Sequence, residues 1–425
     1  MKSPAAANTI WILSERAIRL AVGLVVGVWV ARYLGPEQYG VLSFGIAWVA
    51  LFSTIATLGL PHVLTRDLSL APDSAGVLLS TAGLLRLAGG VACLFLATGI
   101  FAAFHGTGDP RMWVVLPVAT GTVFHAGDVI EYWFRSRVEW KYVFRVRLIT
   151  LGVATFFRIV LVLAERNVLW IAAVIPLEAA LTAGLLLVQM VLHGSRVKPG
   201  RPSGEVAARL VRDGFPVLLA GVAIMVYTKI DQVMIGIFLA NYEVGVYAVA
   251  VRLATVWYVI PTAITQSVLP GTIAARDRSR TEYEGRIIRV VALLFWCFLG
   301  VAAAVTFSGP LVIRVLLGEE YGAAGPALQI HIWSGLGVSV GVAIQQWYLA
   351  ENRLEIDLYR TVAGAVVNLG LNLILIPRAG IFGAALATVA AQVVAAYLSA
   401  AWFPTARDAW RLLNAGIAYP FRTVR

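Results

Sequence analysis

About twelve stretches of this chain are each apolar over a length that could cross a lipid bilayer. They lie at 10–31, 41–60, 76–104, 112–134, 148–164, 168–192, 214–239, 245–270, 287–307, 324–349, 354–376 and 380–403. A helix needs roughly 20 mostly apolar residues to span the hydrocarbon core, because each residue advances it by only about 1.5 Å. The pattern predicts an all-α, polytopic membrane protein with about twelve transmembrane helices.

The composition supports this reading. Of the 425 residues, 60% are hydrophobic and 13% are charged, whereas soluble domains carry about 25% charged residues. A net charge of +11 could indicate nucleic-acid binding in a soluble protein. Here the basic residues gather between spans, so loops facing anionic lipid heads explain them better, and no nucleic-acid partner is expected. Cys93 and Cys297 lie inside spans and give neither zinc spacing nor a disulfide framework.

The connections are short, and the longest is a glycine- and proline-rich segment between the sixth and seventh spans. It predicts an N-terminal six-helix lobe at 1–195, a cytoplasmic linker at 196–212 and a C-terminal six-helix lobe at 213–425 with a short tail. LGPEQYG at 34–40 and LANYEVG at 239–245 share their spacing. We therefore expect two bundles related by a pseudo-two-fold axis along the membrane normal, with a cavity between them.

The basic residues of the loops are unevenly divided between the two sides of this topology. With the N-terminus in the cytoplasm, the outer segments hold only Arg32, Arg111, Arg166, Arg314 and Arg378, and the inner ones hold most of the rest. This positive-inside bias predicts that both termini are cytoplasmic and that the protein lies in the cytoplasmic (inner) membrane. The first apolar run lacks a clear cleavage site and is longer than a signal-peptide core, so we expect it to be retained.

Several cations lie inside the spans, where each costs roughly 2.5–3.5 kcal/mol at the bilayer centre. They are the candidate substrate-binding residues Arg16, Arg19, Arg86, Lys229 and Arg252. Arg16, Arg86 and Arg252 have no obvious local partner. Facing a cavity, they would make a basic lumen suited to phosphate, which arginine binds with a planar fork of donors. Snorkelling to the interface is the plain alternative, plausible for Arg16 and Arg19 but poor for Arg86.

Other charges suggest local pairs. Glu15 precedes Arg19 by four residues, which is the favourable helical order, and Glu131 precedes Arg135 in the same way. Arg158 and Glu178 lie at similar depth in adjacent spans, where they could neutralise each other.

Four polar residues lie at similar depth in the outer half of the last helices. Asp231 is eight residues from the outer end of its span, and Asn368, Asn372 and Thr388 fall at comparable depth in spans 11 and 12. A carboxylate, two amide oxygens and a hydroxyl suit a small hard cation such as sodium, so these are the candidate ion-coupling residues. Hydrogen bonding between helices is the competing explanation.

Enzyme signatures are missing from the sequence. The five histidines are scattered without metal spacing, and no Walker motif occurs, so we expect no catalytic residues, no bound metal and no cofactor. The protein is thus predicted not to be an enzyme.

An ordered series of short motifs carries a family resemblance. They are ARYLGPEQYG at 31–40, RDL at 66–68, KIDQVM at 229–234, VGVYAVA at 244–250, WYVIP at 257–261, NLGLNLILIP at 368–377 and GIFGAA at 380–385. With these, the chain resembles polysaccharide exporters and lipid-linked oligosaccharide flippases of the multidrug/oligosaccharidyl-lipid/polysaccharide exporter superfamily. The resemblance covers nearly the whole chain.

The resemblance implies two six-helix bundles that alternate between inward- and outward-open states, and a polyprenyl-diphosphate-linked glycan as cargo. It also implies a sodium site formed by Asp231, Asn368, Asn372 and Thr388, although Asn372 stands where a second acid can occur. Sodium or proton coupling would bias the cycle. The lipid bilayer, a polysaccharide polymerase and glycosyltransferases are the partners that it suggests.

Three functions are weighed. The first is flipping of a lipid-linked oligosaccharide repeat unit from the cytoplasmic to the outer leaflet for cell-surface polysaccharide assembly, by alternating access. The second is a cation-coupled drug or toxin antiporter of the same fold, which favours an acidic lumen rather than a basic one. The third is a membrane glycosyltransferase or polymerase, for which the outer connections are too short.

Overall fold

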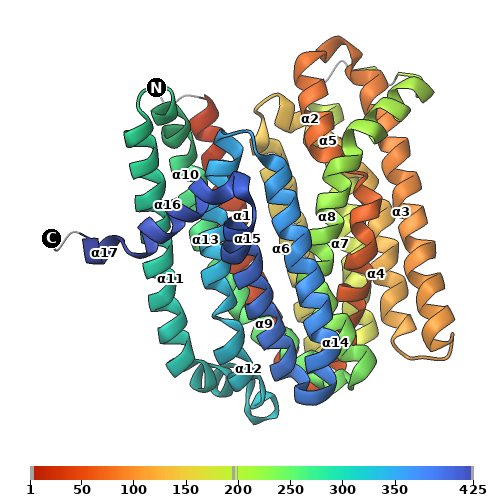
Figure 1. Cartoon of the computed structure of the whole chain (residues 1–425). Coiled ribbons are helices and arrows are strands. Elements are labelled where there is room, and N and C mark those ends of the chain that lie inside the picture. Colours follow the sequence, from red (N-terminus) through yellow and green to blue (C-terminus); the bar gives the residue numbers. More distant parts are fainter. Residues whose placement is uncertain (1–3, 194–196, 199, 423–425) are drawn as a thin grey trace. The chain divides into compact units, whose positions relative to one another are not determined.

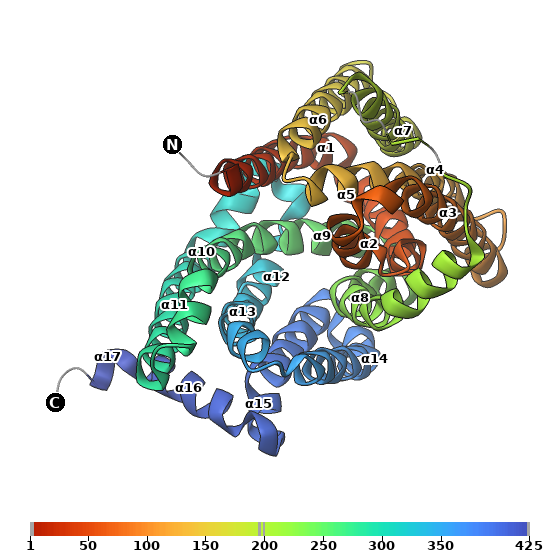
Figure 2. The same ribbon diagram turned by 90° about the horizontal axis from the view of Figure 1, so that it is seen from above.

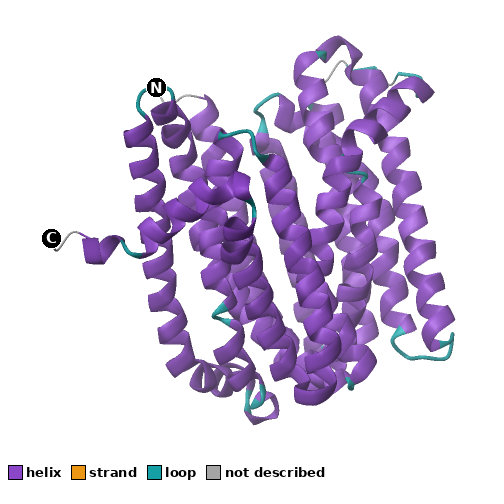
Figure 3. Ribbon diagram, viewed as in Figure 1, coloured by secondary structure: helices purple, strands orange, loops and turns teal. Residues whose placement is uncertain are grey.

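The computed structural model describes residues 4–193, 197–198 and 200–422, and all the regular structure in these ranges is helical (Figure 3). The predicted lobe boundary at 195–196 lies outside the described residues. The helices are α1 (Pro4–Thr57), α2 (Leu60–Leu70), η1 (Pro72–Ser74), α3 (Ala75–His105), α4 (Met112–Phe124), η2 (His125–Gly127), α5 (Asp128–Ser136), α6 (Trp140–Leu163), α7 (Val168–Leu192), α8 (Gly204–Phe238), α9 (Asn241–Thr255), η3 (Val256–Tyr258), α10 (Val259–Arg276), α11 (Arg280–Leu317), η4 (Glu319–Tyr321), α12 (Ala324–His331), α13 (Ser334–Ala350), α14 (Leu354–Val393), η5 (Val394–Leu398), α15 (Ser399–Trp402), η6 (Pro404–Ala406), α16 (Arg407–Ile417) and α17 (Tyr419–Arg422).

Ten helical stretches among the described residues are long and apolar enough to cross a membrane. The first, Ile10–Leu70, has 61 residues, and the last, Glu355–Trp402, has 48. At about 1.5 Å per residue these would measure roughly 90 and 70 Å, far more than the core of about 30 Å. Each therefore holds two of the predicted spans. The all-helical, multi-spanning architecture is confirmed.

Glycines divide the two longest stretches. Gly35 has φ 69° inside α1, and Gly380 has φ 59° inside α14. Glycine adopts this left-handed region at no steric cost. Gly35 lies in the predicted connection 32–40, and Gly380 is the first residue of the predicted last span, directly after the connection 377–379. Gly364, in the first part of α14, packs against Ala391 and Ala395, so the two parts of α14 lie side by side.

The chain forms two compact units. Unit 1 consists of Met1–Leu34 and Val41–Met225, and unit 2 of Gly35–Gly40 and Val226–Arg425. The units thus differ from the predicted lobes in two segments, because residues 35–40 group with unit 2 and the first part of α8 groups with unit 1. The division at 196–212 stays a prediction.

In unit 1, α4 packs against both α3 and α7 (Figure 2). One apolar cluster joins α2, α3, α5 and α6 and includes the buried side chains of Leu64, Phe134 and Val143. Arg66 and Asp67 of the RDL motif fasten α2 to α8. Arg66 donates a hydrogen bond of 3.0 Å to Asp213, and Asp67 pairs with Arg209 at 3.3 Å.

In unit 2, α11 packs along α12 and α13. The amphipathic α16 lies across α11 rather than along it (Figure 1). The core of this unit joins Tyr283, Ile344, Trp347 and Leu413. Many large apolar side chains point outward in both units, among them Phe307, which is 87% exposed, and Phe104, which is 80% exposed. Such a surface suits acyl chains rather than water.

The two repeated motifs meet inside unit 2. A Cβ on Gly245 would lie 2.0 Å from the carbonyl oxygen of Pro36, so only glycine allows this approach. Asn241 donates a hydrogen bond of 3.2 Å to Glu37. The two segments that the sequence analysis compared are therefore packed against each other.

Candidate functional site

Arg86 on α3 is buried and bonded on several sides. The residue is 3% exposed, and no other Asp, Glu, Lys or Arg lies in α3. One terminal nitrogen, Nη2, donates to Asp128 at 2.8 Å and to the His125 carbonyl at 2.9 Å, and Nη1 donates to the Ala56 carbonyl at 3.3 Å. The expectation that Arg86 lacks a local partner is wrong, because the chain turns at η2 and brings Asp128 back beside α3. Arg86 therefore holds α3 against η2 and α5.

The other intramembrane charges of unit 1 also meet acids. Arg19 pairs with Glu15 at 2.8 Å and approaches Glu178 at 3.6 Å, while Arg158 pairs with Glu178 at 2.9 Å. Glu131 binds Arg147 of α6 rather than Arg135, since the buried face of α5 turns Glu131 toward α6. The pairs Glu15–Arg19 and Arg158–Glu178 are confirmed. Arg16 lies exposed on α1.

The connection between α3 and α4 holds a further ion pair. Asp109 accepts hydrogen bonds from the backbone nitrogen of Arg111 at 2.8 Å and from its Nη2 at 2.6 Å. Partial burial by itself raises the pKa of the Asp109 carboxyl, but the hydrogen bonds from Arg111 outweigh this and hold the pKa below its ordinary value. The Arg111 guanidinium also lies 4.7 Å from the ring centre of Phe44.

Unit 2 treats its cations differently. Lys229 on α8 is half-buried and makes no hydrogen bond or ion pair with another described residue. It lies close enough to Arg252 and to Asp231 to feel the charge of both. Arg252 donates to the hydroxyl of Tyr39 at 2.9 Å, so it does have local partners, contrary to expectation, and one of them is a phenol. Two cations thus share one region of unit 2.

The predicted ion-coupling acid is Asp231, which is 3% exposed. Its carboxylate accepts a hydrogen bond of 2.6 Å from the hydroxyl of Tyr247 and one of 2.8 Å from the backbone nitrogen of Gln232. Thr388 lies within hydrogen-bonding reach of the same Tyr247 hydroxyl. The ring nitrogen Nδ1 of His331 is 3.4 Å from it. Tyr247 therefore connects Asp231 with Thr388 and His331.

Asn368 and Asn372 are fully buried and bonded to each other, with 3.1 Å from Nδ2 of Asn372 to Oδ1 of Asn368. The remaining atoms, Nδ2 of Asn368 and Oδ1 of Asn372, are buried without a partner. A free amide oxygen is a suitable cation ligand, yet no group of three His, Cys, Asp or Glu residues gathers anywhere in the described part of the chain. The four predicted residues thus supply one negative charge between them.

Tyr247 and His331 do not stand out in the sequence as site residues. Both lie in apolar segments, His331 at the end of a short helix and Tyr247 within VGVYAVA. Buried tyrosine hydroxyls usually find a polar partner, and an acid on a neighbouring helix of similar depth was the available signal. Tyr247 and His331 are far apart along the chain, so no local sequence pattern predicts their contact.

The chain was compared with known proteins. The profile of a family described as "Polysaccharide biosynthesis protein" matches residues 5–274. A probable flippase, AglR, of Haloferax volcanii is 30% identical over 43% of this chain and 39% of that protein. The chain spans less than half the length of the curated relatives it matches.

Solved structures share the fold. An inward-facing multidrug resistance transporter, of the MATE family within the MOP superfamily, superposes with TM-score 0.73 at 17% identity over 93% of this chain and 95% of that one. The lipid II flippase MurJ, in an inward closed conformation, superposes with TM-score 0.71 at 15% identity over 97% of this chain and 92% of that one.

Proposed function

Because this chain belongs to the polysaccharide biosynthesis protein family, we propose that it flips a polyprenyl-diphosphate-linked oligosaccharide repeat unit from the cytoplasmic to the outer leaflet. Membership confirms the resemblance seen in the sequence. It makes the chain a membrane transporter in polysaccharide biosynthesis rather than an enzyme, which removes the glycosyltransferase or polymerase alternative. The cargo, the direction of movement and the compartment belong to the proposal.

The observation that carries the proposal is the position of Lys229. A half-buried ammonium group in a spanning helix is costly unless it meets water or an anion. Lys229 has neither a hydrogen bond nor an ion pair among the described residues, and a second cation, Arg252, lies nearby. Asp231 attracts Lys229 while Arg252 repels it, so a further anion beside the two cations would stabilise both charges. A diphosphate headgroup is such an anion, and Arg252 offers the planar fork that suits it.

Unit 1 contributes the remaining basic candidates. Arg16 is exposed on α1, and Arg19 keeps part of its side chain exposed beside Glu15. We assign both to cargo contact and remove Arg86 from it, because its guanidinium is enclosed by Asp128 and carbonyl groups. The glycan would cross within the protein while the lipid tail stays in the bilayer. A polymerase and glycosyltransferases would supply and use the cargo.

Coupling would act through Asp231. A bound sodium ion or proton would change the charge of the cluster formed by Asp231, Thr388 and His331 around Tyr247. Asn368 and Asn372 lie in the same unit as this cluster. A ligand drives a conformational cycle only through unequal affinity for the two states. The bond from Tyr247 to Asp231 is one interaction that such a ligand would have to alter.

The test uses cells that lack the gene for this chain and its paralogues. Wild-type chain should restore outward movement of lipid-linked repeat units, measured by their access to an impermeant glycan-modifying enzyme. Lys229→Ala should lower the rate at least tenfold, while Lys141→Ala, which removes an exposed lysine that stacks on Tyr142, should not. Normal export in the gene-deleted cells would defeat the proposal. Equal rates for both variants would remove Lys229 from the cargo path.

The same cells separate the flippase from a drug antiporter. An antiporter of this fold should change the uptake of cationic dyes when Asp231 is replaced by Asn, with glycan export unaffected. The basic pair in unit 2 argues for anionic cargo instead, since Lys229 and Arg252 would repel a cationic drug.

A further inference from the structure

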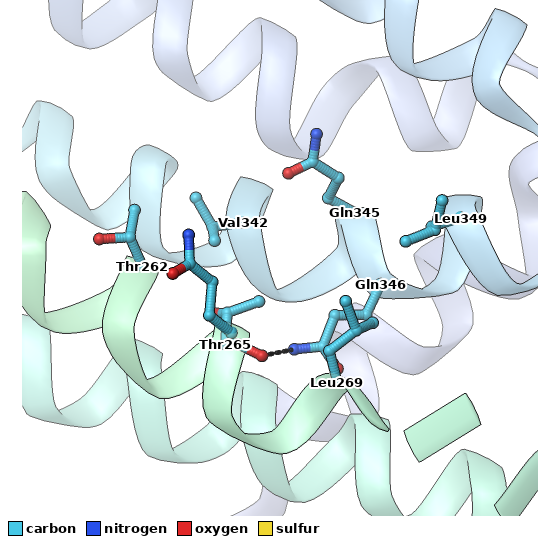
Figure 4. Close-up of a pocket in the computed structure, with 8 residues that line it drawn as sticks. Thr262, Thr265, Leu269, Val342, Gln345, Gln346 and Leu349 are labelled. Carbon is cyan, nitrogen blue, oxygen red and sulfur yellow. Dashed lines mark hydrogen bonds between the residues drawn. The ribbon is translucent and has the colours of Figure 1, made fainter. Parts of the chain in front are cut away.

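Unit 2 has a pocket that the proposed headgroup contacts do not use. It lies between α10 and α13, has a volume of about 250 Å³, and is lined by Thr262, Thr265, Gln266, Leu269, Val342, Gln345, Gln346 and Leu349 (Figure 4). None of these eight residues is charged. A pocket of this volume falls just below the range of about 300–1,000 Å³ that holds drug-sized ligands, so it fits one ring-sized group.

Two buried polar atoms in this pocket have no partner. Gln346 is 3% exposed, and its Nε2 donates a hydrogen bond of 3.1 Å to the Thr265 carbonyl. The Oε1 atom of Gln346 has no hydrogen-bond partner among the described residues. The Thr265 hydroxyl is also buried and without a partner. A buried polar group without a hydrogen bond destabilises the fold, because it has lost its bonds to water and gained none in return. Two of them on facing helices indicate a place where a ligand supplies the missing bonds.

The neighbouring glutamine is held in place from a third helix. Gln345 is exposed, and its Nε2 donates 2.9 Å to Asp357 of α14. Asp357 is fixed in turn by Arg360, whose Nε lies 2.6 Å from its other oxygen. The Gln345 amide is therefore oriented while its carbonyl oxygen stays available. An exposed amide on a spanning helix is unfavourable against acyl chains, which indicates that this side of α13 meets water or a polar ligand.

We propose that this pocket binds one uncharged sugar ring of the transported glycan. The amides of Gln345 and Gln346 and the hydroxyl of Thr265 match hydroxyl groups, which both donate and accept. Leu269 and Leu349 offer apolar surface to the C–H face of the ring. The inference rests on the proposed function and adds a second subsite, which takes the neutral part of a cargo whose anionic part meets Lys229 and Arg252.

The direct test measures sugar binding to the purified full-length chain. Methyl glycosides of neutral hexoses and of N-acetylhexosamines are titrated while saturation transfer from protein to sugar is recorded by NMR. At least one neutral glycoside should bind, and glucuronate should bind no better, because the pocket offers no cation. Gln346→Leu and Thr265→Val should each weaken binding at least tenfold.

Matched controls lie in the same unit. Nε2 of Gln329 also donates a hydrogen bond to a threonine carbonyl on another helix, the carbonyl of Thr306, at 2.7 Å. Thr272 is a buried threonine of α10 that lies outside the pocket. Gln329→Leu and Thr272→Val should bind sugar as the wild type does. Gln345→Leu is a third pocket variant with little cost to folding, since the side chain is exposed.

The outcomes separate the pocket from the function. The proposal that this pocket binds a sugar is wrong if no neutral glycoside binds. It is also wrong if Gln346→Leu and Gln345→Leu bind sugar as the wild type does. If the pocket variants lose sugar binding but gene-deleted cells still export their glycan, the pocket stands and the proposed function fails. If wild-type chain restores export and the pocket variants restore it equally, the function stands and the pocket is not part of it.

Discussion

Several charged side chains of unit 1 are paired with opposite charges, whereas those around Asp231 in unit 2 have other partners. In unit 1, Arg86, Arg147 and Arg158 each form an ion pair with a carboxylate, and these pairs join neighbouring helices. In unit 2, the buried acid Asp231 is bonded by a phenol and a backbone nitrogen, and Lys229 has no hydrogen bond or ion pair within the part of the chain that the structure describes. A closed ion pair resists change, whereas a carboxylate bonded by neutral groups can exchange one partner for another. We therefore assign coupling and headgroup binding mainly to unit 2.

The largest effect is expected at the closed pair of unit 1. Replacing Arg86 by Met takes the guanidinium away from the half-buried carboxylate of Asp128, which keeps the His125 ring at 3.2 Å, and should cost about 3 kcal/mol of stability. Thermal unfolding of the purified chain measures this. The double variant Arg86→Met with Asp128→Leu should recover most of the loss, because both charges are gone. A single variant that folds normally but transports poorly would instead make Arg86 a cargo residue and break the comparison.

A smaller effect on stability, but a specific one on transport, is expected in unit 2. Tyr247→Phe removes the hydroxyl that donates to Asp231 and should cost about 1–3 kcal/mol. It should also change the dependence of transport on the sodium or proton gradient, measured in proteoliposomes. Tyr321→Phe, at another fully buried tyrosine of the same unit, is the control. An unchanged gradient dependence in Tyr247→Phe would mean that the Asp231 cluster is as static as the pairs of unit 1.

The smallest effect concerns Asp109 in the connection between α3 and α4 of unit 1. Its pKa is lowered in the folded chain, so the pair with Arg111 stabilises the fold above the ordinary carboxyl pKa of about 3.9, and this contribution is lost as the pH falls through the lowered folded value. Asp109→Asn should lower stability by less than about 1 kcal/mol at neutral pH. The difference from wild type should vanish in acid. A difference that persists there would point to packing rather than charge.

The sequence predicts the helices well, because hydropathy over some twenty residues is a direct consequence of the bilayer. It also predicts Glu15–Arg19, since neighbours four apart share a helix face. It fails where partners come from distant segments. Arg86 and Asp128 are 42 residues apart and meet only because the chain turns at η2. Tyr247 and His331, 84 apart, meet through the packing of α9 and α12. No local pattern encodes such contacts.

The chain passes between its units three times, after Leu34, after Gly40 and after Met225. A cut within 200–203 would therefore not release two self-sufficient pieces. The front fragment would carry residues 35–40, which complete unit 2, and the rear fragment would carry 204–225, which complete unit 1. Each fragment would hold a segment that the other fragment needs to complete its unit, so neither unit would be complete in one fragment.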